Sequence, residues 1–275
     1  MRYIEIENQI PYYSFESFEK VGFLRHLFTT RLGGASHGDQ KSLNLSFNQG
    51  NEPEAVRENY RRVAKALGVS DSDIDCSMQT HTTNVEKVGK EQAGRGVTKP
   101  LDIVDVDGMV TNEPGVVLAT FYADCVPLYF VDPVKKCIGL SHSGWRGTVG
   151  RIGEKTIKKM TAEYGTNPSD VIAAIGPSIC QSCYEVSTDV AEQFIKEFGK
   201  SEHLEDISKL CYKTDSEHYQ LNLWEANKIV FLEAGVKPEN IEIANLCTCC
   251  NSENLFSHRA SHGKRGNLGA FLGII

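Results

Sequence analysis

Three apolar, β-branched runs follow one another in the middle of the chain. VVLATFY covers 116–122, VPLYFV covers 126–131 and CIGLSH covers 137–142. Runs of this composition and length are typical of strands, and the DPVKK segment between the last two predicts a turn and therefore a hairpin. Cys125 then falls where one strand breaks into the next. His142 falls at the carboxyl end of a strand, before a glycine-rich turn.

Helical patterns alternate with strand patterns along the rest of the chain. Apolar residues recur at helical spacing after Asn51 and Pro53, and Gly68 ends that pattern. Further helices are predicted over 147–164, 187–198 and 221–234, with Ser187 as a cap and Gly199 as a stop, and further strands over 171–176 and 241–246.

This order of elements predicts an α/β (α+β) fold, a layered sandwich of mixed β-sheets covered by helices. The chain has 275 residues, 40% of them hydrophobic, which is enough to bury a full core. No low-complexity linker divides it, and we expect a single domain over 1–275 and a monomer.

The overall charge limits the partners of the chain. A formal net charge of −7 argues against a nucleic-acid surface, because a phosphate backbone requires a basic stripe.

The amino terminus lacks the apolar core of a signal peptide, and no run approaches the roughly 20 apolar residues of a membrane span. Nine cysteines, two of them adjacent at Cys249 and Cys250, suit a reducing cytoplasm better than a disulfide framework.

Three short segments each place one metal-binding side chain beside a turn. They are QTH with His81, ADC with Cys125 and SHSGWRG with His142. Each of these residues alone is more often structural. Two imidazoles and one thiolate can nevertheless hold Zn²⁺ in three tetrahedral positions and leave the fourth for water or substrate. Cys125 and His142 flank the predicted hairpin, and we expect His81 to approach it from a polar loop.

The GWRG turn predicts an anion site. A glycine-bracketed turn that leads into a helix presents free backbone N–H groups, and Arg146 adds a guanidinium. The alternative is that Gly144 and Gly147 only allow a sharp turn while Trp145 fills core. Further anion candidates are Arg31, Arg259, Lys264 and Arg265.

Three other motifs give weaker evidence of a metal site. Cys180 and Cys183 form a CxxC pair that resembles half of a zinc deaminase site in the wrong order, which indicates coincidence. The carboxyl-terminal group resembles a zinc knuckle, but its spacing is unusual and we do not expect a second metal there. That group consists of Cys247, Cys249, Cys250, His258 and His262. DIVDVDG at 102–108 lacks calcium-loop spacing and predicts a strand and its turn.

Motifs along most of the chain resemble those of the YfiH-like laccase-domain family. They are RLGGAS with SLNLS, QTHTTNV, VDGMVTN, ADCVPLYFVDP, SHSGWRGTVGRI, IGPSICQSCYEV, LCTCCN and FSHRASHGKRG. The match begins at Phe28 and extends nearly to the carboxyl end. Members of this family are described as purine nucleoside phosphorylases and were earlier labelled multicopper polyphenol oxidases.

The resemblance implies that His81, Cys125 and His142 are zinc ligands. It also implies phosphorolysis of adenosine, inosine and S-methyl-5′-thioadenosine, with some adenosine deamination, and a layered sandwich with internal duplication. No sequence repeat reveals that duplication. We predict substrate contacts from residues in or beside the matching motifs: Arg31, Asn44, Gln79, Arg146 and Arg259.

Four alternatives to zinc-dependent phosphorolysis remain open. A multicopper oxidase would need several more histidines, commonly in HxH pairs, whereas this chain has eight histidines and no HxH; a single copper at the predicted site is still compatible with weak oxidation. A cysteine hydrolase would use Cys125 as nucleophile and His142 as its base. The others are a binding module without turnover and a peptidoglycan-precursor editing factor, a role linked to proteins that resemble this chain.

Overall fold

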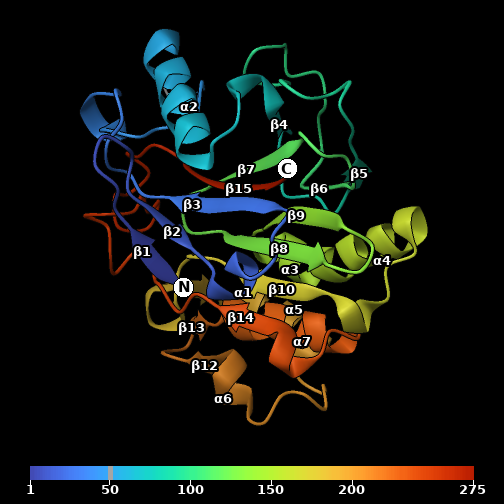
Figure 1. Cartoon of the computed structure of the whole chain (residues 1–275). Coiled ribbons are helices and arrows are strands. Elements are labelled where there is room, and N and C mark those ends of the chain that lie inside the picture. The colour runs from blue at the N-terminus through green and yellow to red at the C-terminus, as the bar shows by residue number, and fades with distance from the viewer. Residues whose placement is uncertain (49–51) are drawn as a thin grey trace.

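Two six-stranded mixed sheets stack face to face at the centre of the computed structural model, which describes residues 1–48 and 52–275 (Figure 1). The first sheet contains, in spatial order, β1 Arg2–Ile4, β2 Tyr12–Ser14, β3 Leu24–Thr29, β15 Leu268–Ile274, β7 Val117–Tyr122 and β4 Ile74–Cys76. The second contains β14 Ile241–Ile243, β10 Ile172–Ile175, β8 Val126–Asp132, β9 Cys137–Ser143, β6 Gly108–Thr111 and β5 Val85–Lys87. This arrangement confirms the predicted sandwich of mixed sheets, whereas the single domain and the duplication stay predictions.

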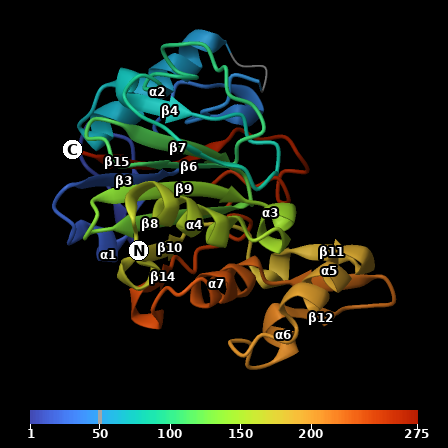
Figure 2. The ribbon, with the colours of Figure 1, turned by 90° about the vertical axis from the view of Figure 1, so that its right-hand side faces the viewer.

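Helices cover the outer faces of both sheets (Figure 2). The helix α2 Pro53–Leu67 lies over the first sheet. Most of the other helices lie on the side of the second sheet, beside a small third sheet; the short α1 packs against β3. The helices other than α2 are α1 Glu16–Glu19, α3 Trp145–Val149, α4 Ile152–Tyr164, α5 Thr188–Phe198, α6 Ile207–Leu210 and α7 Leu223–Glu233. The third sheet is β11 Glu185–Ser187, β13 His218–Leu221 and β12 Cys211–Lys213, and the 3₁₀ turns are η1 Gly38–Gln40, η2 Asp71–Asp73, η3 Pro168–Asp170, η4 Gln181–Cys183 and η5 Pro238–Asn240.

Alternation along the central strands builds the layers. Side chains on a strand point to opposite faces in turn, so a strand covered on both faces is apolar throughout. In β8, Leu128 and Phe130 pack toward α4 and α7, while Tyr129 and Val131 pack between the two sheets. The apolar runs of the sequence are therefore buried on both faces.

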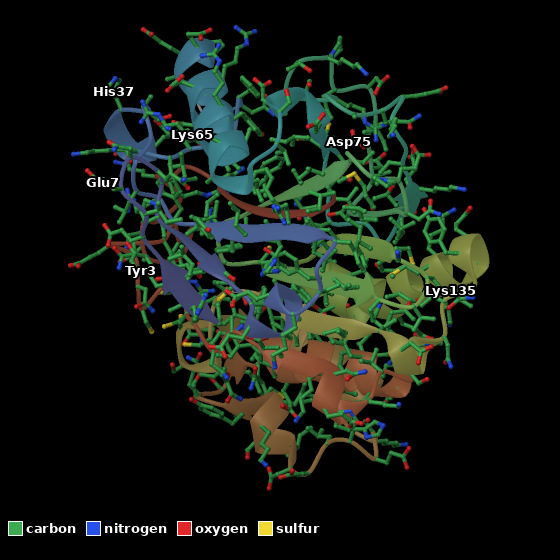
Figure 3. The ribbon with its side chains drawn as sticks, in the orientation of Figure 1. Tyr3, Glu7, His37, Lys65, Asp75 and Lys135 are labelled. Atoms are coloured by element: carbon green, nitrogen blue, oxygen red, sulfur yellow. The ribbon has the colours of Figure 1, made fainter. Side chains whose placement is uncertain are left out.

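The amphipathic helix α2 confirms its predicted pattern. Val56, Tyr60 and Val63 pack on the first sheet, and Lys65 lies on the exposed side (Figure 3). Gly68 ends the helix in the left-handed conformation, at a φ of +72°, which a glycine adopts without strain. Asn51 lies outside the described residues.

The predicted helix over 147–164 is wrong in one respect, because it is two helices. α3 ends at Val149, and Arg151 adopts a left-handed φ of +59° before α4 begins. Three carboxylates hold that arginine at 2.6–3.1 Å: Glu154, Glu197 and Glu233. Gly150 lies so close to the loop after β4 that a Cβ there would meet Thr83 Cγ2 at 2.6 Å.

Smaller differences concern helix ends. The helix predicted over 221–234 begins at Leu223, because Leu221 pairs in β13 and Asn222 caps the helix through its side chain. Ser187 occupies the cap position of α5, but its hydroxyl donates to Asp189 rather than accepting a backbone N–H, and Gly199 is right-handed. These differences leave the order of elements unchanged.

The chain passes from the first sheet to the second next to the predicted ligand Cys125. β8 and β9 form the predicted antiparallel hairpin, with Pro127 opposite His142. β7, however, belongs to the first sheet and β8 to the second, so residues 123–125 cross between the layers. Cys125 therefore lies at the junction of both sheets. No helix among the described residues is long and apolar enough to cross a membrane.

Candidate functional site

His81, Cys125 and His142 come together at the edge of the two sheets, and we call them the His–Cys–His group. His81 follows β4 in a polar loop, Cys125 precedes β8, and His142 lies near the end of β9. One ligand atom from each residue lies within 4.8 Å of the others, and His81 Nε2 is 3.9 Å from Cys125 Sγ. The predicted approach of the 79–84 loop to the hairpin therefore occurs.

Asp107 organises the His–Cys–His group from behind. Its buried carboxylate bonds His142 Nδ1 at 2.8 Å and accepts the backbone N–H of His81 at 3.0 Å. It also accepts the backbone N–H groups of Thr80 and Thr82, at 3.2 and 2.8 Å. With Nδ1 engaged, Nε2 of His142 is free to bind a metal, and a carboxylate behind the ring is typical of histidine ligands.

Sequence reasoning missed Asp107. It falls inside the DIVDVDG segment, which forms a loop leading into β6 at Gly108 rather than a strand with its turn. The VDG segment lies among the matching motifs, but the residue types alone give no reason to prefer Asp107 over Asp102 or Asp105. The preference arises because the described fold buries only Asp107 of these three.

Gly144 allows the histidine and the cysteine to approach the turn after β9. A Cβ on this residue would lie 2.7 Å from His81 Cδ2 and 3.3 Å from Cys125 Sγ. Its φ of −74° is open to any residue, so close approach and not backbone conformation requires glycine here. The GWRG segment thus contributes to the site through its first glycine.

Opposed charges shift the pKa values in this group. Burial raises the pKa of the Cys125 thiol, but His142 and His81 beside it lower the value to about 6. Burial lowers the pKa of His142, but the Cys125 thiolate and Asp107 raise it to about 9. Burial likewise raises the pKa of Asp107, and its bond to His142 holds it below the ordinary value. Without a metal, these opposite shifts favour a thiolate on Cys125 and an imidazolium on His142.

A cavity of about 600 Å³ opens onto the His–Cys–His group, and all three residues line it. This volume is within the usual range for small-molecule sites. Four aromatic residues are among those that line it: Phe47, Tyr60, Phe121 and Tyr122. The cationic residues at the cavity are Arg57, Lys99 and Arg265.

Two predicted substrate contacts are bonded to the backbone near the cavity. The Gln79 amide, which lines the cavity, donates to Phe121 O at 3.0 Å and accepts from Phe121 N at 2.7 Å. Gln79 thereby ties the His81 loop to β7. Asn44 is buried and accepts the N–H groups of Ser46 and Asn267.

Three predicted anion-binding arginines lie outside the residues that line the cavity. Arg31 donates to the carbonyl groups of Lys41 and Ser252, and Arg259 donates to those of Cys183 and Glu185. Arg146 is exposed and stacks on the Trp145 ring at 4.2 Å.

Arg265 differs from these three arginines. It lines the cavity, and its buried Nε has no hydrogen-bond partner within the described residues. Its charge interacts with Cys125 and Asp124, although burial lowers the pKa of the guanidinium. It is the arginine best placed to meet an anion beside the His–Cys–His group.

The donor set of the His–Cys–His group fits zinc. Two imidazole nitrogens and a thiolate at about 2.0–2.3 Å from Zn²⁺ would be separated by about 3.3–3.8 Å. The 3.9 Å between His81 Nε2 and Cys125 Sγ needs only a small contraction, and the other separations are within 4.8 Å. Three protein ligands that face a cavity leave one metal position open, which is typical of a catalytic site.

Comparison with known proteins identifies relatives of the whole chain. Residues 25–275 match the model of the family described as multi-copper polyphenol oxidoreductase laccase. The chain is 36% identical over 248 residues to purine nucleoside phosphorylase YlmD of Bacillus subtilis, covering 90% of this chain and 87% of that protein. It is 33% identical over 256 residues to a purine nucleoside phosphorylase of Bacteroides thetaiotaomicron, covering 92% and 93%.

A solved structure agrees with these matches. The crystal structure of YlmD from Geobacillus stearothermophilus superposes with a TM-score of 0.89 at 34% identity, over 99% of this chain and 98% of that one. Sequence, fold and length thus agree over nearly the entire molecule, and the chain belongs to the multi-copper polyphenol oxidoreductase laccase family.

Proposed function

We propose that this chain is a zinc-dependent purine nucleoside phosphorylase. Its substrates are adenosine, inosine and S-methyl-5′-thioadenosine together with phosphate, and it has adenosine deaminase activity as a side reaction. The observation that carries the proposal is the His–Cys–His group at the cavity of about 600 Å³. The names of relatives at 33–36% identity support purine nucleosides and phosphate as the class of substrate.

The histidine distribution favours zinc over a multicopper centre. A trinuclear copper cluster needs several histidines together. Among the described residues, only the His–Cys–His group brings histidines into a set with metal-binding spacing, and it contains two. Zinc bound there would supply a Lewis acid beside the cavity, able to stabilise negative charge that develops during the reaction.

Phosphorolysis places two demands on the residues of the cavity. A phosphate oxygen forms a bond to the anomeric carbon while the bond from that carbon to the purine nitrogen breaks, and its electron pair leaves with the base. The anionic phosphate therefore needs a cation, and the Arg265 guanidinium at the cavity supplies it. The purine needs an apolar surface, for which the Phe47 and Phe121 rings are suited.

One incubation tests the proposed reaction. Inosine with the purified protein and phosphate is expected to yield hypoxanthine and ribose 1-phosphate, resolved by chromatography. Adenosine should yield adenine, with inosine as the deamination product. Equal release of base without phosphate would identify a hydrolase and overturn the proposal.

The cysteine hydrolase alternative has one supporting observation, the low pKa of Cys125 beside His142. A metal-bound thiolate is poorly available as a nucleophile, so the two functions respond oppositely to a chelator. We expect chelation to abolish phosphorolysis and added zinc to restore it. Activity that persists after complete zinc removal would favour the hydrolase.

We also propose that the protein acts as a monomer in the cytoplasm. The nine free thiols are consistent with a reducing compartment. Size-exclusion chromatography with light scattering tests the oligomeric state, for which one chain of 30.5 kDa is expected.

A further inference from the structure

Four cysteines from two distant segments meet outside the cavity, and we call them the four-cysteine cluster. Cys180 immediately precedes η4 and Cys183 is its last residue, while Cys247 and Cys250 lie in the loop after β14. All four Sγ atoms lie within 4.8 Å of one another. Each pair has the spacing CxxC. In the sequence alone the first pair is interpreted as coincidence and the second as part of an incomplete zinc knuckle, whereas the fold brings the two pairs together. His258 and His262 are not members of the cluster.

The spacing of the sulfurs fits a single tetrahedral metal. Cys183 Sγ lies 3.4 Å and Cys180 Sγ 4.0 Å from Cys250 Sγ. Zinc–sulfur bonds of about 2.3 Å place the four sulfurs of a tetrahedron about 3.8 Å apart. A disulfide would need two sulfurs about 2.0 Å apart. An iron–sulfur cluster distributes its thiolates over two or more irons, so it would need larger separations between the sulfurs.

Backbone groups already support a charged sulfur in the cluster. The N–H groups of Cys180 and Cys250 donate to Cys247 Sγ at 3.3 and 3.4 Å. Binding Zn²⁺ to four cysteines releases four thiol protons to solvent and leaves a net charge of −2, which such N–H donors offset. The arrangement is therefore more than a chance meeting of thiols.

The backbone also holds the two segments in register. Ser178 and Cys247 form an isolated parallel bridge, in which Ser178 N donates to Leu246 O and Thr248 N donates to Ser178 O, both at 3.2 Å. These contacts hold the chain just before Cys180 beside Cys247 without using the sulfurs. A metal would find the ligands already gathered.

We propose that the four-cysteine cluster binds a second zinc ion, closed to substrate because all four ligands come from the protein. Its role is to fasten the two segments to the strand crossover that carries Cys125. Asp124, the preceding residue, accepts Ile179 N–H at its carbonyl oxygen and the Thr248 hydroxyl at its carboxylate, at 3.0 and 2.6 Å. The site is independent of the proposed reaction.

Metal analysis of the purified full chain tests the second site. The unaltered protein should hold two zinc ions, and replacing Cys180 and Cys183 by serine should remove one of them. Cys249→Ser is the matched control, because Cys249 lies in the same loop outside the cluster, and it should keep both. Cys125→Ala should lose the other zinc, which separates failure at one site from failure at the other.

X-ray absorption keeps the test decisive should the double serine variant fail to fold. In Cys125→Ala the remaining zinc is expected to show four sulfur neighbours and no nitrogen. A protein that holds at most one zinc, with all of it lost in Cys125→Ala, would overturn the proposal. Iron in place of zinc, or a mixed nitrogen and sulfur shell in Cys125→Ala, would overturn it as well.

Discussion

Asp107 bonds His142 Nδ1 at 2.8 Å while the same carboxylate accepts the backbone N–H of His81. One buried side chain therefore orients two of the three proposed metal ligands, which come from separate parts of the chain. His81 requires this support, because its φ of +66° is left-handed and unusual for a residue other than glycine. Three N–H groups converging on one carboxylate hold that conformation.

Asp107→Asn should weaken zinc binding by about 10–100-fold, the usual effect of removing a carboxylate behind a histidine ligand. The neutral amide accepts fewer hydrogen bonds and no longer balances the charge of the centre. Competition with a chromogenic chelator measures the affinity.

The control for this change is Asp105→Asn. Asp105 is exposed, and among the described residues its side chain accepts only the Thr80 hydroxyl. Its φ of +58° is one that asparagine tolerates. Unchanged zinc affinity in Asp107→Asn would show that Asp107 is not needed to orient the ligands.

Gly144→Ala should reduce zinc occupancy and activity at least 10-fold. The new methyl group would lie 2.7 Å from the His81 ring, so the ring or the turn must move. Gly147→Ala provides the comparison, since a Cβ there meets nothing closer than 3.5 Å and alanine favours the helix α3. Equal zinc content in the two variants would argue against this steric account.

Cys125 in the metal-free protein should alkylate with a pH midpoint near 6. Its pKa lies below the ordinary value, so the reactive thiolate persists at neutral pH and is lost only as the pH falls through 6. Mass spectrometry of the peptide that contains Cys125 follows the rate without interference from other thiols. In denaturant the same thiol should titrate at about 8.5, and in the folded protein zinc should protect it from alkylation. A midpoint near 8.5 in the folded protein would contradict the ion pair with His142.

Arg265→Lys should raise the KM for phosphate by about 10–100-fold and leave zinc content unchanged, because it loses one charge-assisted bond to the anion. Steady-state kinetics at varied phosphate and saturating inosine measure the effect. Arg146→Lys tests the anion site predicted from the GWRG turn, and we expect a smaller change because Arg146 lies outside the cavity lining. The opposite ranking of the two variants would move the phosphate site to α3.

The sequence predicted the fold best where one pattern repeats along a strand or helix. The runs at 126–131 and 137–142 gave the hairpin because both faces of these strands are buried. The break between α3 and α4 escaped prediction because two of the three carboxylates around Arg151, Glu197 and Glu233, lie far away along the chain. A local pattern cannot contain that information.

The candidate site divides in the same way. The grouping of His81, Cys125 and His142 was predictable, because few residue types can bind zinc and these three each lie beside a turn. Asp107 was not singled out, because carboxylates are common and only the fold buries this one beside the centre. Arg265 was one of several anion candidates, and only the fold distinguishes it from the others by placing it in the cavity lining. The four-cysteine cluster escaped because each pair is incomplete until the fold joins them.

The short crossover at 123–125 limits how the length of the chain can vary. One added residue would either carry Cys125 away from both histidines or shift β8 by one position, which would exchange the side chains of its two buried faces. A deletion would have the same effect in reverse. We therefore expect related chains to differ in length at the outer loops and to keep the same number of residues between the positions of Tyr122 and Val126.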